Sequence, residues 1–202
     1  MHLRTTVGQR RRILSLLLGS ALLTALAPSV AGAACPTSSA AVSFAQFGDS
    51  ASYSLAPGGS FESGAPGWSL SNAAVTSGNE SFNVVAGSHS MAIEAGGLAV
   101  SPRVCVSSEY PSFRFFVRRT GGSGSSTLSA TLRWMSVLGL SVETPAGSVV
   151  GGSSWAPSPV MKLGDSVPLW LPGSTLETQL VFRASSGGSW VIDDLFIDPY
   201  RR

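Results

Sequence analysis

The sequence has few of the side chains on which most enzymes depend. Its 202 residues include two histidines, two cysteines and a single lysine, Lys162, and only 12% of the residues are charged. No Gly-x-Ser-x-Gly segment is present to supply a nucleophile for His89, and no Cys-x-x-Cys pair is present for metal or redox chemistry. We therefore expect no catalytic residues and a protein that is not an enzyme.

A glycosidase built on two carboxylates is also not predicted. Such an enzyme needs two acids that face each other across a cleft. Asp193 and Asp194 are adjacent in a strand-like segment, and adjacent strand residues point to opposite faces of a sheet. The two carboxylates could share one side only if a β-bulge intervened.

The first 33 residues have the order of a secretory signal peptide. Arg4 and Arg10 to Arg12 precede an apolar run from Ile13 to Leu26, and Ala31-Gly32-Ala33 forms a small-x-small cleavage site. The run is too short for a stable membrane span, so we expect an exported, extracellular protein. The paired arginines Arg10 and Arg11 leave both the general secretory and the twin-arginine routes open.

Removal of this segment changes the charge of the chain. The net charge of the whole sequence is +2, but residues 34–202 hold nine basic and eleven acidic side chains, a net charge of −2. The sequence therefore favours neither nucleic acid nor an anionic membrane as a partner.

The two cysteines predict one disulfide, Cys35–Cys105, in an oxidising compartment. Closing so long a loop would stabilise the fold by about 4 kcal/mol in a chain-entropy model. A metal pair or a redox pair is the alternative, and the missing Cys-x-x-Cys argues against both. Lipidation of Cys35 is disfavoured because Gly32 stands where a bulky aliphatic residue is expected.

Turn signals recur about every ten residues, and no segment of useful length shows a helical period. Short β-branched and aromatic runs separate the turns, and this arrangement favours an all-β sandwich or barrel. We expect an N-terminal arm at residues 34–57, with an edge strand from Val42 to Phe47, and a β-sandwich domain at residues 58–202. Gly121–Ser126 is interpreted as a loose hairpin loop.

Three segments alternate clearly between apolar and polar residues, and each predicts a strand with one buried face. The predicted core positions are Phe113, Phe115, Val117, Leu128, Ala130, Leu132, Trp134, Leu180, Phe182 and Ala184.

Two segments, Gly58–Trp68 (GGSFESGAPGW) and Ser189–Pro199 (SWVIDDLFIDP), resemble the first and last core strands of the galactose-binding-like jelly roll, a two-sheet antiparallel β-sandwich shared by many carbohydrate-binding modules. Each motif is short, but their order and spacing together are moderately specific. The chain as a whole also resembles small exported proteins of high-GC bacteria, which implies no activity. The resemblance implies core positions for Phe61, Trp68, Trp155, Trp190 and Ile192.

The same resemblance implies one structural calcium ion where the first and last strands meet. The matching residues are Glu62 with Asp193 or Asp194, and backbone carbonyls would complete the oxygen ligands. Alternatively, the two aspartates bind loop amides or pair with arginines.

A ligand-binding face is expected on the polar side of the alternating strands. Guanidinium groups suit carboxylates and hydroxyls, and aromatic rings stack on sugars. The alternative is an ordinary solvated sheet face. The candidate residues are Arg114, Phe116, Arg118, Arg133, Arg183 and, in a proline-flanked loop, Trp170.

These observations predict an exported, non-catalytic binding module for cell-wall or other extracellular carbohydrate. The alternative is a structural or protein-interaction domain of the cell surface without a sugar site.

Overall fold

The computed structural model describes residues 39–107, 112–136, 138–162 and 175–198. The chain divides into two compact units, Met1–Ala31 and Gly32–Arg202, and all of the described residues belong to the second. The predicted signal peptide, Cys35 and Trp170 lie outside the described residues. In the described ranges, no helix is long and apolar enough to cross a membrane.

The described part of the chain is built almost entirely from antiparallel strands. It contains one short 3-10 helix, η1 (Ala45–Phe47), and the strands β1 (Ser54–Leu55), β2 (Ser69–Ser77), β3 (His89–Val100), β4 (Val104–Ser107), β5 (Ser112–Arg119), β6 (Thr127–Met135), β7 (Ser141–Val150), β8 (Ala156–Pro157), β9 (Met161–Lys162), β10 (Thr175–Ala184) and β11 (Trp190–Asp198).

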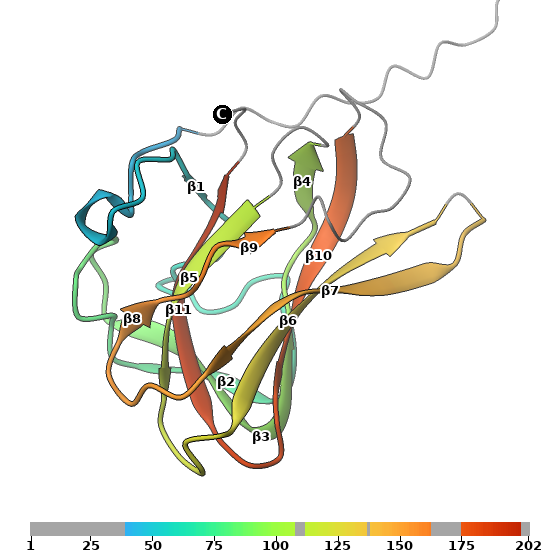
Figure 1. Ribbon diagram of the computed structural model, residues 1–202. Coiled ribbons are helices and arrows are strands. Elements are labelled where there is room, and N and C mark those ends of the chain that lie inside the picture. The colour runs from blue at the N-terminus through green and yellow to red at the C-terminus, as the bar shows by residue number, and fades with distance from the viewer. Residues whose placement is uncertain (1–38, 108–111, 137, 163–174, 199–202) are drawn as a thin grey trace, which may run out of the picture. The chain divides into compact units, whose positions relative to one another are not determined.

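Hydrogen bonds link these strands into one strongly curled sheet. Its main path runs β7-β6-β10-β3-β11-β5-β8, while β1 pairs with β11, β2 with β3, β4 with β10 and β9 with β5 (Figure 1). The curl brings two halves of the sheet face to face, and this arrangement confirms the predicted jelly-roll sandwich.

Strand β3 turns the corner between the two halves. Its segment 91–93 pairs with β11, and its segment 98–100 pairs with β10. Gly96 between them has φ +74°, and a Cβ on Gly97 would lie 2.4 Å from the backbone oxygen of Asn72. Glycine is therefore required where the chain bends from one layer into the other.

The main core lies between the two layers. Phe115 of β5 packs edge-on against Phe182 of β10 with ring centroids 5.1 Å apart, although two strands separate β5 from β10 in the sheet. The alternating residues of β5, β6 and β10 that were predicted to face inward are buried there, except that Trp134 is half-buried. Phe61, Trp68, Trp190 and Ile192 also join this core.

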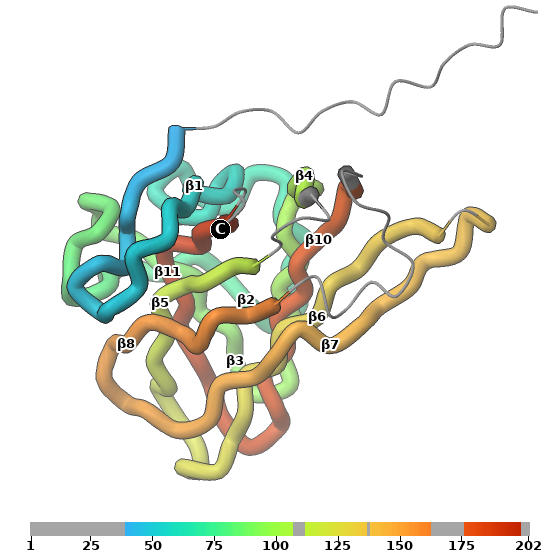
Figure 2. The backbone as a smooth tube through the Cα atoms, turned by 45° about the horizontal axis from the view of Figure 1, so that its top comes forward, coloured from blue at the N-terminus to red at the C-terminus, as the bar shows by residue number. Residues whose placement is uncertain are grey.

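The sheet nearly closes on itself. A Cβ on Gly147 of β7 would lie 2.2 Å from the sulfur of Met161 in β9, which pairs with β5. The two ends of the strand path therefore meet, and in the tube view the orange segment that follows β8 runs close to β7 (Figure 2).

Residues 121–126 connect β5 and β6, but these strands do not form the predicted hairpin. β5 pairs with β11, β8 and β9, whereas β6 pairs with β10 and β7. The Gly-Ser loop instead carries the chain from one layer to the other.

A second aromatic cluster lies on the outer side of β5 and β11. Phe116 and Phe196 point away from the main core and are covered by the arm residues Phe44 and Tyr53. The expected edge strand at Val42–Phe47 is wrong, because η1 occupies its second half and a single bridge pairs Ala41 with Tyr53.

Cys105 lies half-buried in β4 opposite Glu177. The described residues include no free cysteine. Since Cys35 lies outside them, the Cys35–Cys105 disulfide stays a prediction.

Candidate functional site

The outer side of β6, β7 and β10 carries exposed and half-buried polar side chains of one layer. We call it the polar face and define it by Ser129, Thr131, Arg133, Glu143, Gln179 and Arg183. The inward residues of the same strands belong to the main core, so alternation forces these six side chains outward.

Two arginines of the polar face share one carboxylate. Arg133 Nε donates to Glu143 Oε1 at 2.7 Å, and an Arg183 amino nitrogen donates to Oε2 at 3.0 Å. Register explains the contact, because Arg133 lies directly opposite Glu143 in the β6–β7 pair. Partial burial opposes ionisation of Glu143, but hydrogen bonds from Arg183 and Arg133 outweigh it and hold its pKa below the ordinary value.

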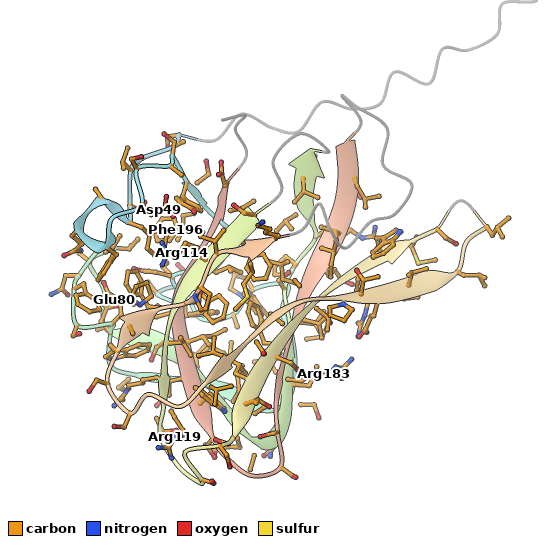
Figure 3. All side chains as sticks on the ribbon, in the orientation of Figure 1. Asp49, Glu80, Arg114, Arg119, Arg183 and Phe196 are labelled. Carbon is orange, nitrogen blue, oxygen red and sulfur yellow. The ribbon has the colours of Figure 1, made fainter. Side chains whose placement is uncertain are left out.

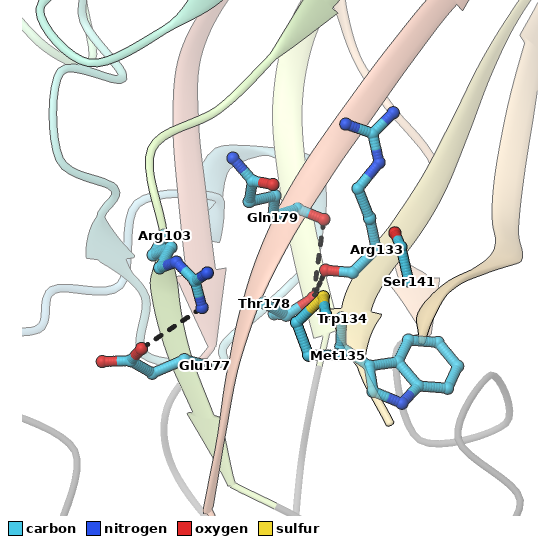
Figure 4. Close-up of a pocket in the computed structure, with 8 residues that line it drawn as sticks. All are labelled: Arg103, Arg133, Trp134, Met135, Ser141, Glu177, Thr178 and Gln179. Atoms are coloured by element: carbon cyan, nitrogen blue, oxygen red, sulfur yellow. Dashed lines mark hydrogen bonds and ion pairs between the residues drawn. The ribbon is translucent and has the colours of Figure 1, made fainter. Parts of the chain in front are cut away.

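A small hollow of about 70 Å³ adjoins the polar face near the turn of the β6–β7 hairpin. Thr178 Oγ1 donates to the backbone oxygen of Arg133 at 2.8 Å, which ties β10 to β6 at its floor. Arg103 and Glu177 form an exposed ion pair of 3.5 Å at its edge (Figure 4). The hollow is lined by Arg103, Arg133, Trp134, Met135, Ser141, Glu177, Thr178 and Gln179.

The five predicted ligand-binding residues that the structure describes do not share one surface. Arg133 and Arg183 lie on the polar face, whereas Arg114, Phe116 and Arg118 lie on β5 in the opposite layer. Figure 3 shows Arg114 and Arg183 at separate places in the molecule. The expectation of a single arginine-lined face is therefore wrong, while ligand binding by any of these residues stays a prediction.

Arg114 and Phe116 are buried rather than exposed, because the N-terminal arm covers this part of β5. Arg114 donates to Asp49 Oδ2 at 2.9 Å and to the backbone oxygen of Ser158 at 2.8 Å, and it lies over the Phe44 ring. Phe116 stacks on Phe44 with centroids 5.3 Å apart.

Arg118 is only half-buried and has a different neighbour. Its guanidinium carbon lies 5.2 Å from the ring centroid of Trp155, a cation–π contact on the outer side of β5. Trp155 packs at the margin of the second aromatic cluster instead of in the main core.

A buried acidic cluster occupies the place where calcium was expected. The register of β11 shifts between Asp193 and Phe196, and Asp194 has φ +45°. This bulge lets both aspartates reach one loop: Asp193 accepts the amide of Glu80 at 2.9 Å, and Asp194 accepts the amide of Val85 at 2.9 Å. The prediction that Asp193 and Asp194 point to opposite faces is thus wrong. A β-bulge was the one exception stated for it, and the structure contains that bulge.

The cluster is electrostatically crowded. Burial, with the charge of Asp194 beside it, raises the pKa of Asp193 to about 8. Burial and the charges of Glu80 and Glu62 raise the pKa of Asp194 to about 7. Glu80 is itself buried, and its carboxylate accepts the amides of Phe82 and Val84.

One carboxylate oxygen of this cluster, Asp194 Oδ1, is buried without a hydrogen-bond partner among the residues that the structure describes. Glu62 contributes from the Gly58–Trp68 segment, and its Oε1 accepts the amides of Ser88 and His89 at 2.9 and 2.7 Å. No group of three histidine, cysteine or acidic side chains among the described residues is arranged to hold a metal. Calcium at this place would therefore depend on Asp194 Oδ1 together with backbone oxygens.

Neither the Asp193–Asp194 pair nor His89 has the arrangement that its catalytic role would require. Asp193 and Asp194 are both 0% exposed, so neither carboxylate can reach a substrate. Ser88 Oγ and Glu62 Oε2 both contact Nδ1 of His89, at 3.1 and 3.3 Å. A serine triad needs its nucleophile and its acid on different ring nitrogens.

Three acidic residues that hold parts of the structure together were not predicted from the sequence. Glu143 was detectable as the cross-strand partner of Arg133 once a β6–β7 hairpin was recognised. Asp49 and Glu80 lie in loops without periodicity. Asp49 pairs with Arg114, 65 residues away in the chain, and the Glu80 carboxylate binds amides of its own loop, two and four residues away.

No family model matches the chain, and no curated protein sequence matches it. Solved structures share its fold. The CBM22-1 xylan-binding domain of Paenibacillus barcinonensis Xyn10C has a TM-score of 0.50 and 15% identity over 71% of this chain and 92% of that domain. The CBM22-1–GH10 modules of Clostridium thermocellum Xyn10B, complexed with xylohexaose, have a TM-score of 0.50 and 17% identity over 71% of this chain and 28% of theirs.

The enzymatically active domain of bacteriophage CBA120 tailspike protein 4 also shares the fold, with a TM-score of 0.51 and 19% identity over 72% of this chain. The chain spans about a fifth of the length of that domain. At these identities the likeness concerns the fold alone.

Proposed function

We propose that this protein is an exported, non-catalytic module that binds extracellular or cell-wall carbohydrate through its polar face and the adjoining hollow. The observation that carries the proposal is the fixed pair of guanidinium groups on Arg133 and Arg183, held on an exposed sheet by Glu143. The jelly-roll fold shared with xylan-binding modules supports the same function.

The chemistry of the face suits a sugar. Guanidinium groups present planar donors to hydroxyl and carboxylate oxygens, and they bind best when they are already oriented. Gln179 is partly oriented as well, since its amide donates to the backbone oxygen of Ser101 at 3.1 Å. Trp134 offers apolar surface to the C–H side of a pyranose ring in the hollow.

The alternative is a surface domain that interacts with proteins or serves a structural role. One observation favours it: Glu143 already satisfies both arginines, so the face is paired within itself. In that case the Arg133–Glu143–Arg183 contact stabilises the sheet and takes part in no recognition.

A glycan array with the purified chain tests the proposal. We expect Arg133→Ala combined with Arg183→Ala to abolish the array signal, while Arg118→Ala leaves it unchanged because Arg118 lies on the opposite layer. No signal with the wild-type chain, or a signal that the double variant retains, would overturn the polar face as the site. A signal lost only with Arg118→Ala would move the site to the outer side of β5.

We propose in addition that one calcium ion stabilises the junction of the Gly58–Trp68 segment and β11. Asp194 Oδ1 is the free oxygen that supports it, and Glu62 is the nearest second carboxylate on the opposing segment. The ion would neutralise the crowded acids and would have no part in sugar chemistry.

A further inference from the structure

The turn between β6 and β7 presents large apolar side chains to solvent. Met135 is 48% exposed, Leu138 81% and Leu140 62%, and these are three of the nine large hydrophobic residues that are exposed in the described part of the chain. We call them the hairpin tip. Scattered exposed leucines are ordinary on protein surfaces, but three within six residues form a patch that needs an explanation.

The hairpin tip is held in place by its own hydrogen bonds. The amide of Ser136 donates to the Leu140 oxygen at 2.8 Å, and Ser136 Oγ accepts the Leu140 amide at 3.1 Å. Gly139 adopts φ +74° and donates to the Ser136 oxygen at 2.9 Å. In this hydrogen-bonded turn, Leu138 and Leu140 are exposed to solvent.

The hairpin tip also projects from the rest of the sheet. In both views the end of the β6–β7 hairpin extends beyond β10, its neighbour in the sheet (Figures 1 and 2). The segment from Trp134 to Val142 contains no charged residue. The first charges below the turn are Arg133 and Glu143, which face each other across the hairpin.

Polarity thus changes in a fixed order along the hairpin. Leucines stand at the end, the half-buried Trp134 stands below them, and Arg133 follows beside the hollow, which Arg103 also lines. Two residues of each strand and the turn separate the charged pair from the end, a length on the order of 10 Å. An apolar element that enters a membrane interface is buried to a depth of about 5–10 Å, with tryptophan and arginine at the headgroups.

The small size of the hairpin tip distinguishes a lipid from a protein as its occupant. A stable protein interface buries roughly 1,000 Å² or more, and three side chains at a narrow projection offer far less. A fluid bilayer accepts a narrow apolar projection without a complementary surface. The apolar area per residue is the quantity that counts there. The nearest arginines, Arg133 and Arg103, are each paired with an acid, so insertion of the hairpin tip does not depend on anionic lipid.

We propose that the hairpin tip inserts into the interface of a lipid bilayer and holds the module against a membrane surface. The membrane is contacted by the hairpin alone and is not spanned. Anchoring at the end of the hairpin leaves Arg183 and Ser129, farther along the polar face, open to other ligands. The inference stands on the exposure and order of the hairpin residues and does not depend on carbohydrate binding.

A probe placed at the hairpin tip tests this directly. Leu138→Cys, labelled with a polarity-sensitive fluorophore, is mixed as the full chain with vesicles of phosphatidylcholine, with or without phosphatidylglycerol. We expect increased emission with both compositions, and quenching when brominated acyl chains are used. The same label on Val150→Cys, which is 60% exposed but lies at the other end of β7, should not respond.

The local readout matters because the apolar run Ile13–Leu26 can bind vesicles by itself. In sedimentation with vesicles, Leu138→Ser combined with Leu140→Ser should weaken tip-dependent binding by at least about tenfold, whereas Val150→Ser should not. A label at position 138 that is unaffected by every vesicle would overturn the proposal. So would a lipid-independent change in sedimentation velocity caused by the double serine variant, because it would identify a second copy of the chain as the occupant.

Discussion

Arg114 and Asp49 form an ion pair that is almost closed to solvent. One guanidinium nitrogen lies 2.9 Å from Asp49 Oδ2, and the two side chains are 9% and 12% exposed. Tyr53 donates its hydroxyl to the same oxygen at 2.7 Å. Since Arg114 belongs to β5 and Asp49 to the arm, this contact fastens the arm over the second aromatic cluster.

Asp49→Ala should therefore loosen the arm and lower the free energy of unfolding by about 3 kcal/mol. The expected loss is large because the variant leaves the Arg114 charge buried without its partner. Denaturant titration monitored by fluorescence would give the value. Glu94→Ala, at an exposed acid of β3, serves as the matched control and should cost less than about 1 kcal/mol. Equal losses in the two variants would contradict a fastening role for Asp49.

The pH dependence of this contribution has a definite sign. Burial opposes ionisation of Asp49, but hydrogen bonds from Ala51, Tyr53 and Arg114 outweigh it and hold the pKa below the ordinary 3.8. A lowered pKa means that the folded state binds fewer protons than the unfolded state. The contribution of Asp49 to the free energy of unfolding is therefore fully present above about pH 3.8 and is lost as the pH falls through the folded pKa. We expect the difference in unfolding free energy between wild type and Asp49→Asn to shrink steadily below that pH. A constant difference down to strong acid would refute this assignment.

Alternation along the chain predicted which side chains of β5, β6 and β10 face the core, because a period of two follows from strand geometry alone. It did not predict what covers the opposite side. Arg114 and Arg133 occupy equivalent outward positions in their strands, yet the arm buries the first and leaves the second half-exposed. The arm has no periodicity, and its contacts with β5 bridge more than sixty residues, so only the assembled fold shows them.

The bulge in β11 has a similar origin. The sequence identified Asp193 and Asp194 as candidate calcium ligands, but its strand pattern predicted that they point to opposite faces of the sheet. The left-handed backbone at Asp194 and the loop amides of Glu80 and Val85 bring both to one place. Backbone irregularities of this kind depend on distant hydrogen-bond donors, and local residue patterns carry no signal for them.

Calcium binding predicts a shift in thermal stability that depends on Asp194. The wild-type chain should melt at a higher temperature with millimolar calcium than with chelator, because the ion relieves repulsion among buried acids. Asp194→Asn should abolish the calcium-dependent shift in calorimetry, whereas Glu94→Gln should keep it. A wild-type melting temperature that is the same in calcium and chelator would remove calcium from this site.

The loop between β5 and β6 depends on one glycine. Gly122 has φ +80°, and a Cβ there would lie 1.9 Å from the backbone oxygen of Gly187. Gly122→Ala should cost roughly 2 kcal/mol or more, since both backbones must move. Gly124→Ala in the same loop meets nothing within 4 Å and is the control, with an expected change under about 1 kcal/mol. Similar melting temperatures for the two variants would show that the loop adapts freely.

Glu143 distinguishes a binding face from a self-paired one. Glu143→Gln keeps the shape of the side chain but removes the charge that Arg133 and Arg183 share. If the polar face binds acidic sugars, the variant should bind uronate-containing glycans more tightly than wild type, because a ligand carboxylate no longer competes with Glu143 for the guanidinium groups. Its unfolding free energy should fall by no more than about 1 kcal/mol, since all three side chains are partly solvated. Unchanged or weaker binding, measured by isothermal titration with the best array ligand, would favour the structural alternative in which the arginines only brace the sheet.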